Sequence, residues 1–213
     1  MKTKNLILLI LAAVMMFIGI VTQAQPNTMT ISESQRLRQE KTALVEWIVA
    51  HTKARKKPIS AVQARKIVES VYEYSAEHQV DPLLVLAMMR NESGFESTAK
   101  SKQGAKGLMQ VMPKYHREKI SSRNPYDVVV SIDVGARVLR EYLDSNNGEV
   151  KPALKKYSGG AKNYYGKISN TYKELSKYLV EHAFINEYPI AIVYSIDKPT
   201  IPATARTVVV ASK

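Results

Sequence analysis

The chain of 213 residues contains no cysteine, which excludes disulfide bonds and thiolate metal sites. Its four histidines have no companion cluster of acidic or histidine residues, so we expect no metal site and no cofactor. Acidic residues are scarce, with 19 Asp and Glu against 31 Lys and Arg, which gives a formal net charge of +12. This balance favours an acidic polymer as partner or serves only solubility. Because no aromatic–basic pattern accompanies it, we expect no nucleic-acid partner.

The longest hydrophobic run lies at the N-terminus, from Leu6 to Val21. Two lysines precede it, and Ala24 follows as a small-residue cleavage site, which is the pattern of an export signal. The run has 16 residues, whereas a membrane-spanning helix needs roughly 20. We therefore expect a cleaved signal peptide, with a retained membrane anchor as the alternative. Either one places the rest of the chain outside the cytoplasm, in the periplasm or cell envelope.

Hydrophobic residues make up 45% of the chain, which is enough for an ordinary core. After the signal segment they recur mostly at helical spacing, separated by turn residues such as Pro, Gly and Asn. We expect Ser32 or Ser34 to cap the first helix and Pro58 to end it. The pattern predicts an all-α body with helices over about 31–57, 60–79, 82–92, 107–112, 128–144, 150–156 and 163–181.

The same pattern divides the chain into four parts. The last part is rich in Val, Ile, Thr and Pro, which favour extended backbone over helix. We expect a signal peptide or anchor over 1–24, a helical N-terminal extension over 25–58, the main helical domain over 59–186, and an extended basic tail over 187–213.

Glu92 ends the most hydrophobic of the predicted helices and is the leading candidate for a catalytic residue. Asp81 and Pro82 are typical of a helix start, and Gly94 permits the left-handed turn that ends the helix. The residues between are almost wholly apolar, so this helix should lie buried at the centre of the domain. A carboxyl group at its end loses hydration, so its pKa rises and it can act as a general acid near neutral pH.

Ordered motifs surround Glu92 in the sequence. They are Val80-Asp81-Pro82-Leu83-Leu84, Glu92-Ser93-Gly94-Phe95, the segment SKQGAKGLMQVMP over 101–113, and Tyr157-Ser158-Gly159-Gly160. In this order and spacing they resemble the catalytic domain of the soluble lytic transglycosylases, the lysozyme-like SLT family, over about residues 60–179. The resemblance implies a lysozyme-like helical domain that acts on peptidoglycan.

The resemblance also implies roles for individual positions. The catalytic glutamate of the family falls on Glu92. The family usually has asparagine at two positions where this chain has Ser131 and Ser158, and the shorter reach of serine leads us to expect altered substrate positioning. The implied substrate-binding positions are Ser101, Gln110, Met112, Tyr157, Ser158 and Tyr164.

The chemistry that the resemblance implies uses one carboxyl group twice. Glu92 would protonate the glycosidic oxygen between MurNAc and GlcNAc, and then take a proton from the MurNAc 6-hydroxyl, giving 1,6-anhydroMurNAc without water. No second catalytic carboxylate, as ordinary glycosidases need, is evident in the sequence. The nearest downstream candidates have other expected places, Asp127 as a helix cap and Asp133 as a surface helix residue.

Two other functions fit the same sequence. One is a hydrolytic muramidase on the same fold, in which water attacks in place of the 6-hydroxyl group. The other is a peptidoglycan-binding assembly protein that does not cut. In each case the partner is the peptidoglycan glycan strand, the N-terminal helix and the C-terminal tail are candidate docking elements for a wall-spanning assembly, and the membrane is a partner only if the signal is uncleaved.

Overall fold

The computed structural model describes residues 31–182, so the predicted signal peptide and the extended tail lie outside the described residues. The described chain contains helices and two isolated β-bridges but no β-strand, which confirms the all-α prediction. The helices are α2 (Ile31–Ala54), α3 (Ala61–Glu77), α4 (Pro82–Glu92), α5 (Arg117–Ile120), α6 (Val128–Asp144), α7 (Val150–Tyr157) and α8 (Tyr164–His182).

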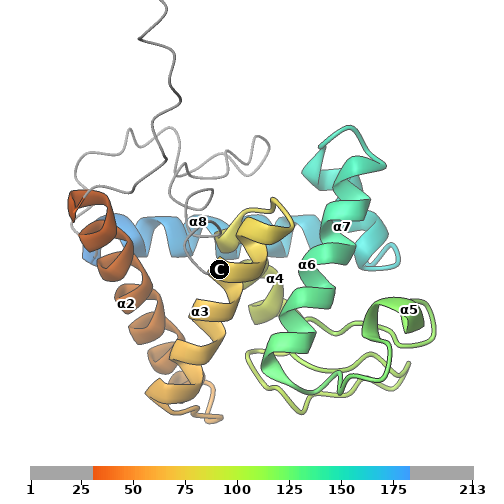
Figure 1. Cartoon of the computed structure of the whole chain (residues 1–213), viewed down its shortest axis with the longest axis horizontal. Helices are drawn as coiled ribbons and strands as arrows, with labels where there is room; N and C mark the ends of the chain where they lie inside the picture. The colour runs from red at the N-terminus through yellow and green to blue at the C-terminus, as the bar shows by residue number, and fades with distance from the viewer. Residues whose placement is uncertain (1–30, 183–213) are drawn as a thin grey trace, which may run out of the picture.

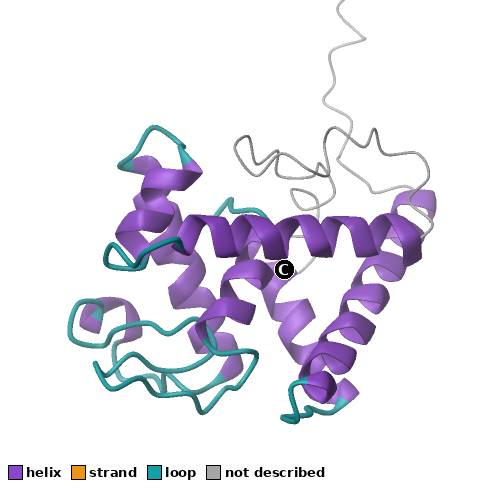
Figure 2. Ribbon diagram, turned by 180° about the vertical axis from the view of Figure 1, so that it is seen from behind, coloured by secondary structure: helices purple, strands orange, loops and turns teal. Residues whose placement is uncertain are grey.

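The helices surround α4, which lies inside the domain (Figure 1). Helices α2 and α3 pack together at one end, while α6, α7 and the loops around α5 form the other end. Helix α8 runs across one face and packs against both α4 and α2, as Figure 2 shows from behind. None of the helices in the described range has the length and hydropathy needed to cross a membrane.

Helix α4 forms as its sequence predicts. The Asp81 carboxylate accepts hydrogen bonds from the backbone N–H groups of Leu83, at 2.7 Å, and Leu84, at 3.2 Å, and Pro82 occupies the first turn. A cap of this kind stabilises a helix by about 1 kcal/mol. Every residue of the segment 82–89 is buried, so the hydrophobic effect fixes the helix at the centre of the core.

The N-terminal extension contributes to the same core. Leu44 and Ile48 of α2 are fully buried. The helix ends at Ala54, earlier than predicted, because Lys56 adopts a left-handed backbone with φ of 59°. Ser32 and Ser34 lie within α2, so the prediction that one of them caps this helix was wrong.

Residues 107–112 form a compact loop and not the predicted helix. Gly107 has φ of 75° and Gln110 has φ of 47°, and two left-handed residues within four positions prevent a right-handed helix. Backbone pairing closes the loop instead, because Lys106 forms isolated bridges to Lys100 and Val111. Leu108 and Met109 of this loop are fully buried, but the prediction of a helix was wrong.

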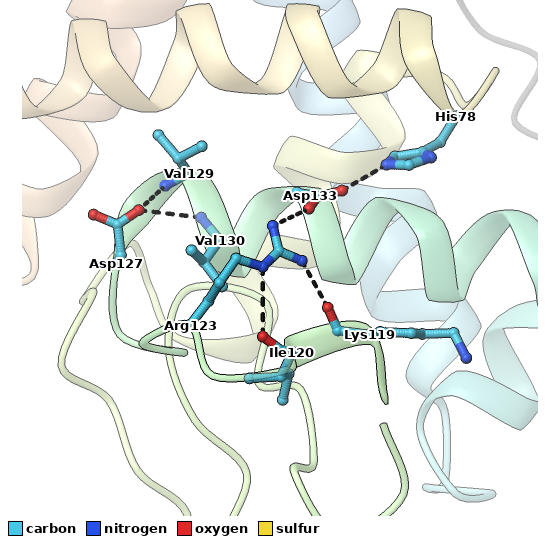
Figure 3. A network of polar contacts seen from close by, with 8 residues as sticks. All are labelled: His78, Lys119, Ile120, Arg123, Asp127, Val129, Val130 and Asp133. Carbon is cyan, nitrogen blue, oxygen red and sulfur yellow. Dashed lines mark hydrogen bonds and ion pairs between the residues drawn. The ribbon is translucent and has the colours of Figure 1, made fainter. Parts of the chain in front are cut away.

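Asp133 is paired inside the fold and does not lie on the helix surface as predicted. Its carboxylate contacts His78 Nε2 at 2.8 Å and Arg123 Nη1 at 2.6 Å, and its side chain is only 14% exposed (Figure 3). Arg123 also donates to the Lys119 carbonyl at 2.6 Å, so this network joins α3 and α6 to the α5 segment. Asp127 caps α6 as predicted.

Candidate active site

Glu92 is the last residue of α4 and faces the start of α8. The Tyr164 hydroxyl donates a hydrogen bond to Glu92 Oε1. Burial raises the pKa of Glu92, and the bond from Tyr164 offsets part of this rise. The carboxyl group therefore keeps its proton to higher pH than an exposed glutamate, which suits a general acid.

The residues just before Glu92 are tied to α8. The Asn91 side-chain amide donates to Thr171 Oγ1 at 3.0 Å, and Arg90 Nη1 donates to the same oxygen at 3.2 Å. Arg90 Nη1 also reaches Glu174 Oε2 at 2.6 Å. The sequence analysis missed Thr171, although it lies seven residues after Tyr164 and so returns to the same face of α8.

The loop that carries Gln110 and Met112 is fixed through the backbone of Met109. Its N–H donates to Ser131 Oγ on α6 at 3.1 Å, and its carbonyl accepts from the Tyr157 hydroxyl on α7 at 2.9 Å. Ser131 is buried, so the serine at this position has a defined partner despite its short reach. Hydrogen bonds from α6 and α7 thereby hold this loop in place.

Tyr157 lies close enough to Glu92 for the two groups to interact electrostatically. Burial raises the pKa of Tyr157 well above its usual value, and the negative charge of Glu92 adds to this rise. The phenol therefore stays protonated and acts as a hydrogen-bond donor. The structure thus brings together three predicted site residues, Glu92, Tyr157 and Tyr164.

The loop residues use their polar groups partly within the loop. Gln110 Nε2 donates to the carbonyls of Gly107, at 2.9 Å, and Ala99, at 3.2 Å. Ser101 Oγ accepts the Ala105 N–H at 3.1 Å. Both side chains are half-buried, as is Met112, so they brace the loop and keep some accessible surface.

Ser158 lies apart from these contacts. It caps the C-terminus of α7, and its hydroxyl donates to the Lys155 carbonyl of the same helix at 3.1 Å. Within residues 31–182 no group of three or more His, Cys, Asp or Glu side chains could hold a metal ion. The described site holds the largely buried carboxyl group of Glu92 with the phenols of Tyr157 and Tyr164 near it.

A family model described as the transglycosylase SLT domain matches residues 69–180, more than half of the chain. The chain belongs to this family. This result confirms the resemblance that the motifs indicated. The SLT match begins within α3 and ends within α8. Helix α2 precedes the matched residues.

The SLT relatives include phage and bacterial proteins. The transglycosylase of Enterobacteria phage PRD1 is 37% identical over 109 residues, which cover 47% of this chain and 40% of the phage protein. Membrane-bound lytic murein transglycosylase C of Haemophilus influenzae (strain PittEE) is 31% identical over 111 residues, which cover 46% of this chain and 30% of that protein. The chain therefore spans less than half the length of each relative.

Two solved structures also align with this SLT chain. An inactive mutant of lytic transglycosylase Slt from Pseudomonas aeruginosa gives a TM-score of 0.42 at 22% identity, covering 59% of this chain and 23% of that one. The complex of the 70-kDa soluble lytic transglycosylase with bulgecin A gives a TM-score of 0.45 at 16% identity, covering 79% and 29%. Both are much longer chains than this one.

Substituting Tyr164 by phenylalanine should raise the pKa of Glu92 further. The hydroxyl of Tyr164 donates to the carboxylate and lowers its pKa, so its loss favours the protonated form. The basic limb of the pH profile of kcat should move to higher pH, and kcat at the optimum should fall about tenfold through lost alignment. Tyr172→Phe is the control, because Tyr172 lies on the same helix but donates to Asp81. An unmoved basic limb in Tyr164→Phe would contradict the conclusion that the Tyr164 hydroxyl lowers the pKa of Glu92.

Glu92→Gln should stabilise the folded protein at neutral pH by about 1 kcal/mol. Burial raises the folded-state pKa of Glu92, so ionisation costs folding free energy as pH rises from about 4, the unfolded value, through the raised pKa. The gain from glutamine should be absent below about pH 4 and complete above the raised pKa. Urea unfolding at pH 4 and pH 7.5 measures it, and an equal difference at both pH values would rule out the linkage.

Proposed function

We propose that this SLT chain is a peptidoglycan lytic transglycosylase in which Glu92 serves as both general acid and general base. The observation that carries the proposal is the Glu92 carboxyl group, which is largely buried, has a raised pKa and accepts a hydrogen bond from Tyr164. Two relatives, a phage transglycosylase and a lytic murein transglycosylase, support the same reaction, and the second supports murein as the substrate.

The proposed reaction has two proton transfers on one carboxyl group. Protonated Glu92 gives its proton to the glycosidic oxygen as the MurNAc–GlcNAc bond breaks, and GlcNAc leaves with a free 4-hydroxyl group. The Glu92 carboxylate then accepts the proton of the MurNAc 6-hydroxyl, whose oxygen bonds to C1. The ring closes as 1,6-anhydroMurNAc, the carboxyl group is protonated again, and no water is consumed.

The contacts of the two downstream carboxylates, Asp127 and Asp133, support an intramolecular nucleophile over water. An inverting or retaining hydrolase needs a second carboxylate next to the scissile bond. Asp133 is paired with His78 and Arg123, and Asp127 Oδ1 caps α6 through Val129 and Val130 (Figure 3). Both downstream candidates therefore have structural partners.

The remaining motif residues would hold the glycan strand. Met109 of the loop from Ser101 to Met112 accepts a hydrogen bond from Tyr157, whose phenol interacts electrostatically with Glu92. We propose that Ser101, Gln110 and Met112 line the sugar groove and that the substrate places this chain in the cell envelope. Docking to a wall-spanning assembly through the extension or the tail remains a hypothesis from composition.

The test is a digest of purified peptidoglycan with the full chain, analysed by mass spectrometry. Muropeptides that end in 1,6-anhydroMurNAc are expected. Reducing-end products heavier by one water would instead identify a hydrolytic muramidase. Binding to peptidoglycan without any cleavage would identify the non-cutting assembly protein and overturn the proposal.

A further inference from the structure

The single tryptophan of the chain, Trp47, lies on α2 against the segment that carries Glu92. Its side chain is buried. The Arg90 guanidinium lies over its ring, 5.5 Å from the centroid, and the Phe95 ring meets it edge-on at a centroid distance of 6.0 Å. Arg90 precedes Glu92 by two residues and Phe95 follows it by three. One side chain of α2 thus contacts the chain on both sides of the acid.

His51 extends this contact by one turn of α2. Its ring stacks on Trp47 at a centroid distance of 5.1 Å with 8° between the planes, and it meets Phe95 edge-on at 6.1 Å. Burial lowers the pKa of His51, and the charges of Arg90 and Arg55 lower it further. At neutral pH the uncharged imidazole therefore packs as an aromatic ring against its neighbours.

The residues just after α2 also approach the turn that follows Glu92. Lys57 Nζ contacts Glu96 Oε2 at 2.6 Å. A Cβ atom added to Gly94 would lie 3.0 Å from Arg55 Nη1, so the turn runs directly beside this guanidinium. Trp47 of α2 thus contacts Arg90 and Phe95, and the residues just after α2 contact the turn at Gly94 and Glu96.

Arg90 connects this contact to α8. Its guanidinium lies over the Trp47 ring and donates hydrogen bonds to the Thr171 and Glu174 oxygens. A smaller residue at position 47 would remove the ring contact and allow the Arg90 side chain to move. Because Arg90 lies on the last turn of α4, its movement would shift the helix end that places Glu92.

We propose that Trp47 is a positioning residue for the transglycosylase reaction, acting on Glu92 through Arg90 and Phe95. The inference rests on the proposed function, since it takes Glu92 as the acid. It assigns a part in the reaction to α2, which precedes the residues that match the SLT family model. The N-terminal helix is then an element of the active site and not only an attachment to it.

The proposal predicts a specific kinetic pattern. A residue that aligns the acid without touching the substrate affects the transition state more than ground-state binding. A displacement of about 1 Å far from the reacting atoms can cost about a hundredfold in rate. Loss of Trp47 should therefore lower kcat and leave KM nearly unchanged.

The experiment compares Trp47→Leu, Trp47→Phe and Arg90→Met with the wild-type full chain on soluble glycan strands, well below each melting temperature. We expect kcat to fall about tenfold to a hundredfold in Trp47→Leu and Arg90→Met with KM within about twofold. Trp47→Phe keeps an aromatic face for Arg90 and should rescue kcat to within about threefold of wild type. Tyr72→Phe is the matched control, because it loosens α2 elsewhere by removing the hydrogen bond to Glu40.

Each outcome decides the matter. A wild-type kcat in folded Trp47→Leu or Arg90→Met, or an equal loss in Tyr72→Phe, would show that Trp47 serves only stability and would overturn the inference. If Trp47→Leu does not fold, Arg90→Met still tests the contact, because it removes the guanidinium and leaves the Trp47 ring in place. A wild-type chain that releases no anhydro product would contradict the proposed function instead, so the two failures are distinguishable.

Discussion

Replacing Glu92 by glutamine should slow glycan cleavage by about a thousandfold. Glutamine has nearly the same shape as glutamate, and its side-chain oxygen still accepts the hydrogen bond from Tyr164. It has no acidic proton to give to the glycosidic oxygen, and it cannot take one from the 6-hydroxyl group. Both steps of the proposed reaction are therefore lost together, while the fold is retained.

The measurement is the rate of release of anhydromuropeptides from purified peptidoglycan. Glu149→Gln is the matched control, because Glu149 is an exposed glutamate at the start of α7 without a side-chain cap bond. The control should keep the wild-type rate to within about twofold. If Glu92→Gln retained a tenth of the wild-type rate or more, Glu92 would not be the acid.

Replacing Gly107 by alanine should destabilise the protein by about 3 kcal/mol or more. Gly107 has φ of 75°, and an added Cβ atom would lie 2.2 Å from the Pro125 carbonyl oxygen and 2.7 Å from Ser131 Oγ. The strained backbone and the steric clash add up, because the loop must move away from α6. Activity should fall as well, since the same loop carries Gln110 and Met112.

Gly104→Ala separates these two effects. Gly104 also has a positive φ, 94°, but an added Cβ atom would meet nothing within 4 Å. Gly104→Ala should therefore lose only the stability that the strained backbone costs, about 1–2 kcal/mol. Urea unfolding of both variants gives the comparison, and equal losses would mean that the clash of the added Cβ atom with Ser131 and Pro125 does not affect stability.

The sequence determined the parts of this fold whose signals are local. Asp81 and Pro82 begin α4 and Gly94 turns the chain after it, because capping and left-handed turns depend on neighbouring residues. The apolar helix between them could only be buried. The position of Glu92 at the end of a buried helix, and the direction of its pKa shift, followed from these local features.

The tertiary structure alone decided how distant segments meet around Glu92. The 107–112 loop is apolar enough for a helix, yet Gly107 and Gln110 adopt left-handed backbone because Ser131 and Tyr157 hold Met109 from two other helices. Spacing along the chain contains no signal for such a contact.

The partners of Glu92 were decided in the same way. Tyr164 reaches Glu92 from α8, 72 residues away, and Trp47 reaches Arg90 from α2. Asp133 looked like a surface residue until the packing of α3 and α5 brought His78 and Arg123 to it. Local backbone preferences placed Glu92 at the end of a buried helix, whereas long-range packing, which depends on the crossing of whole helices, determined what surrounds it.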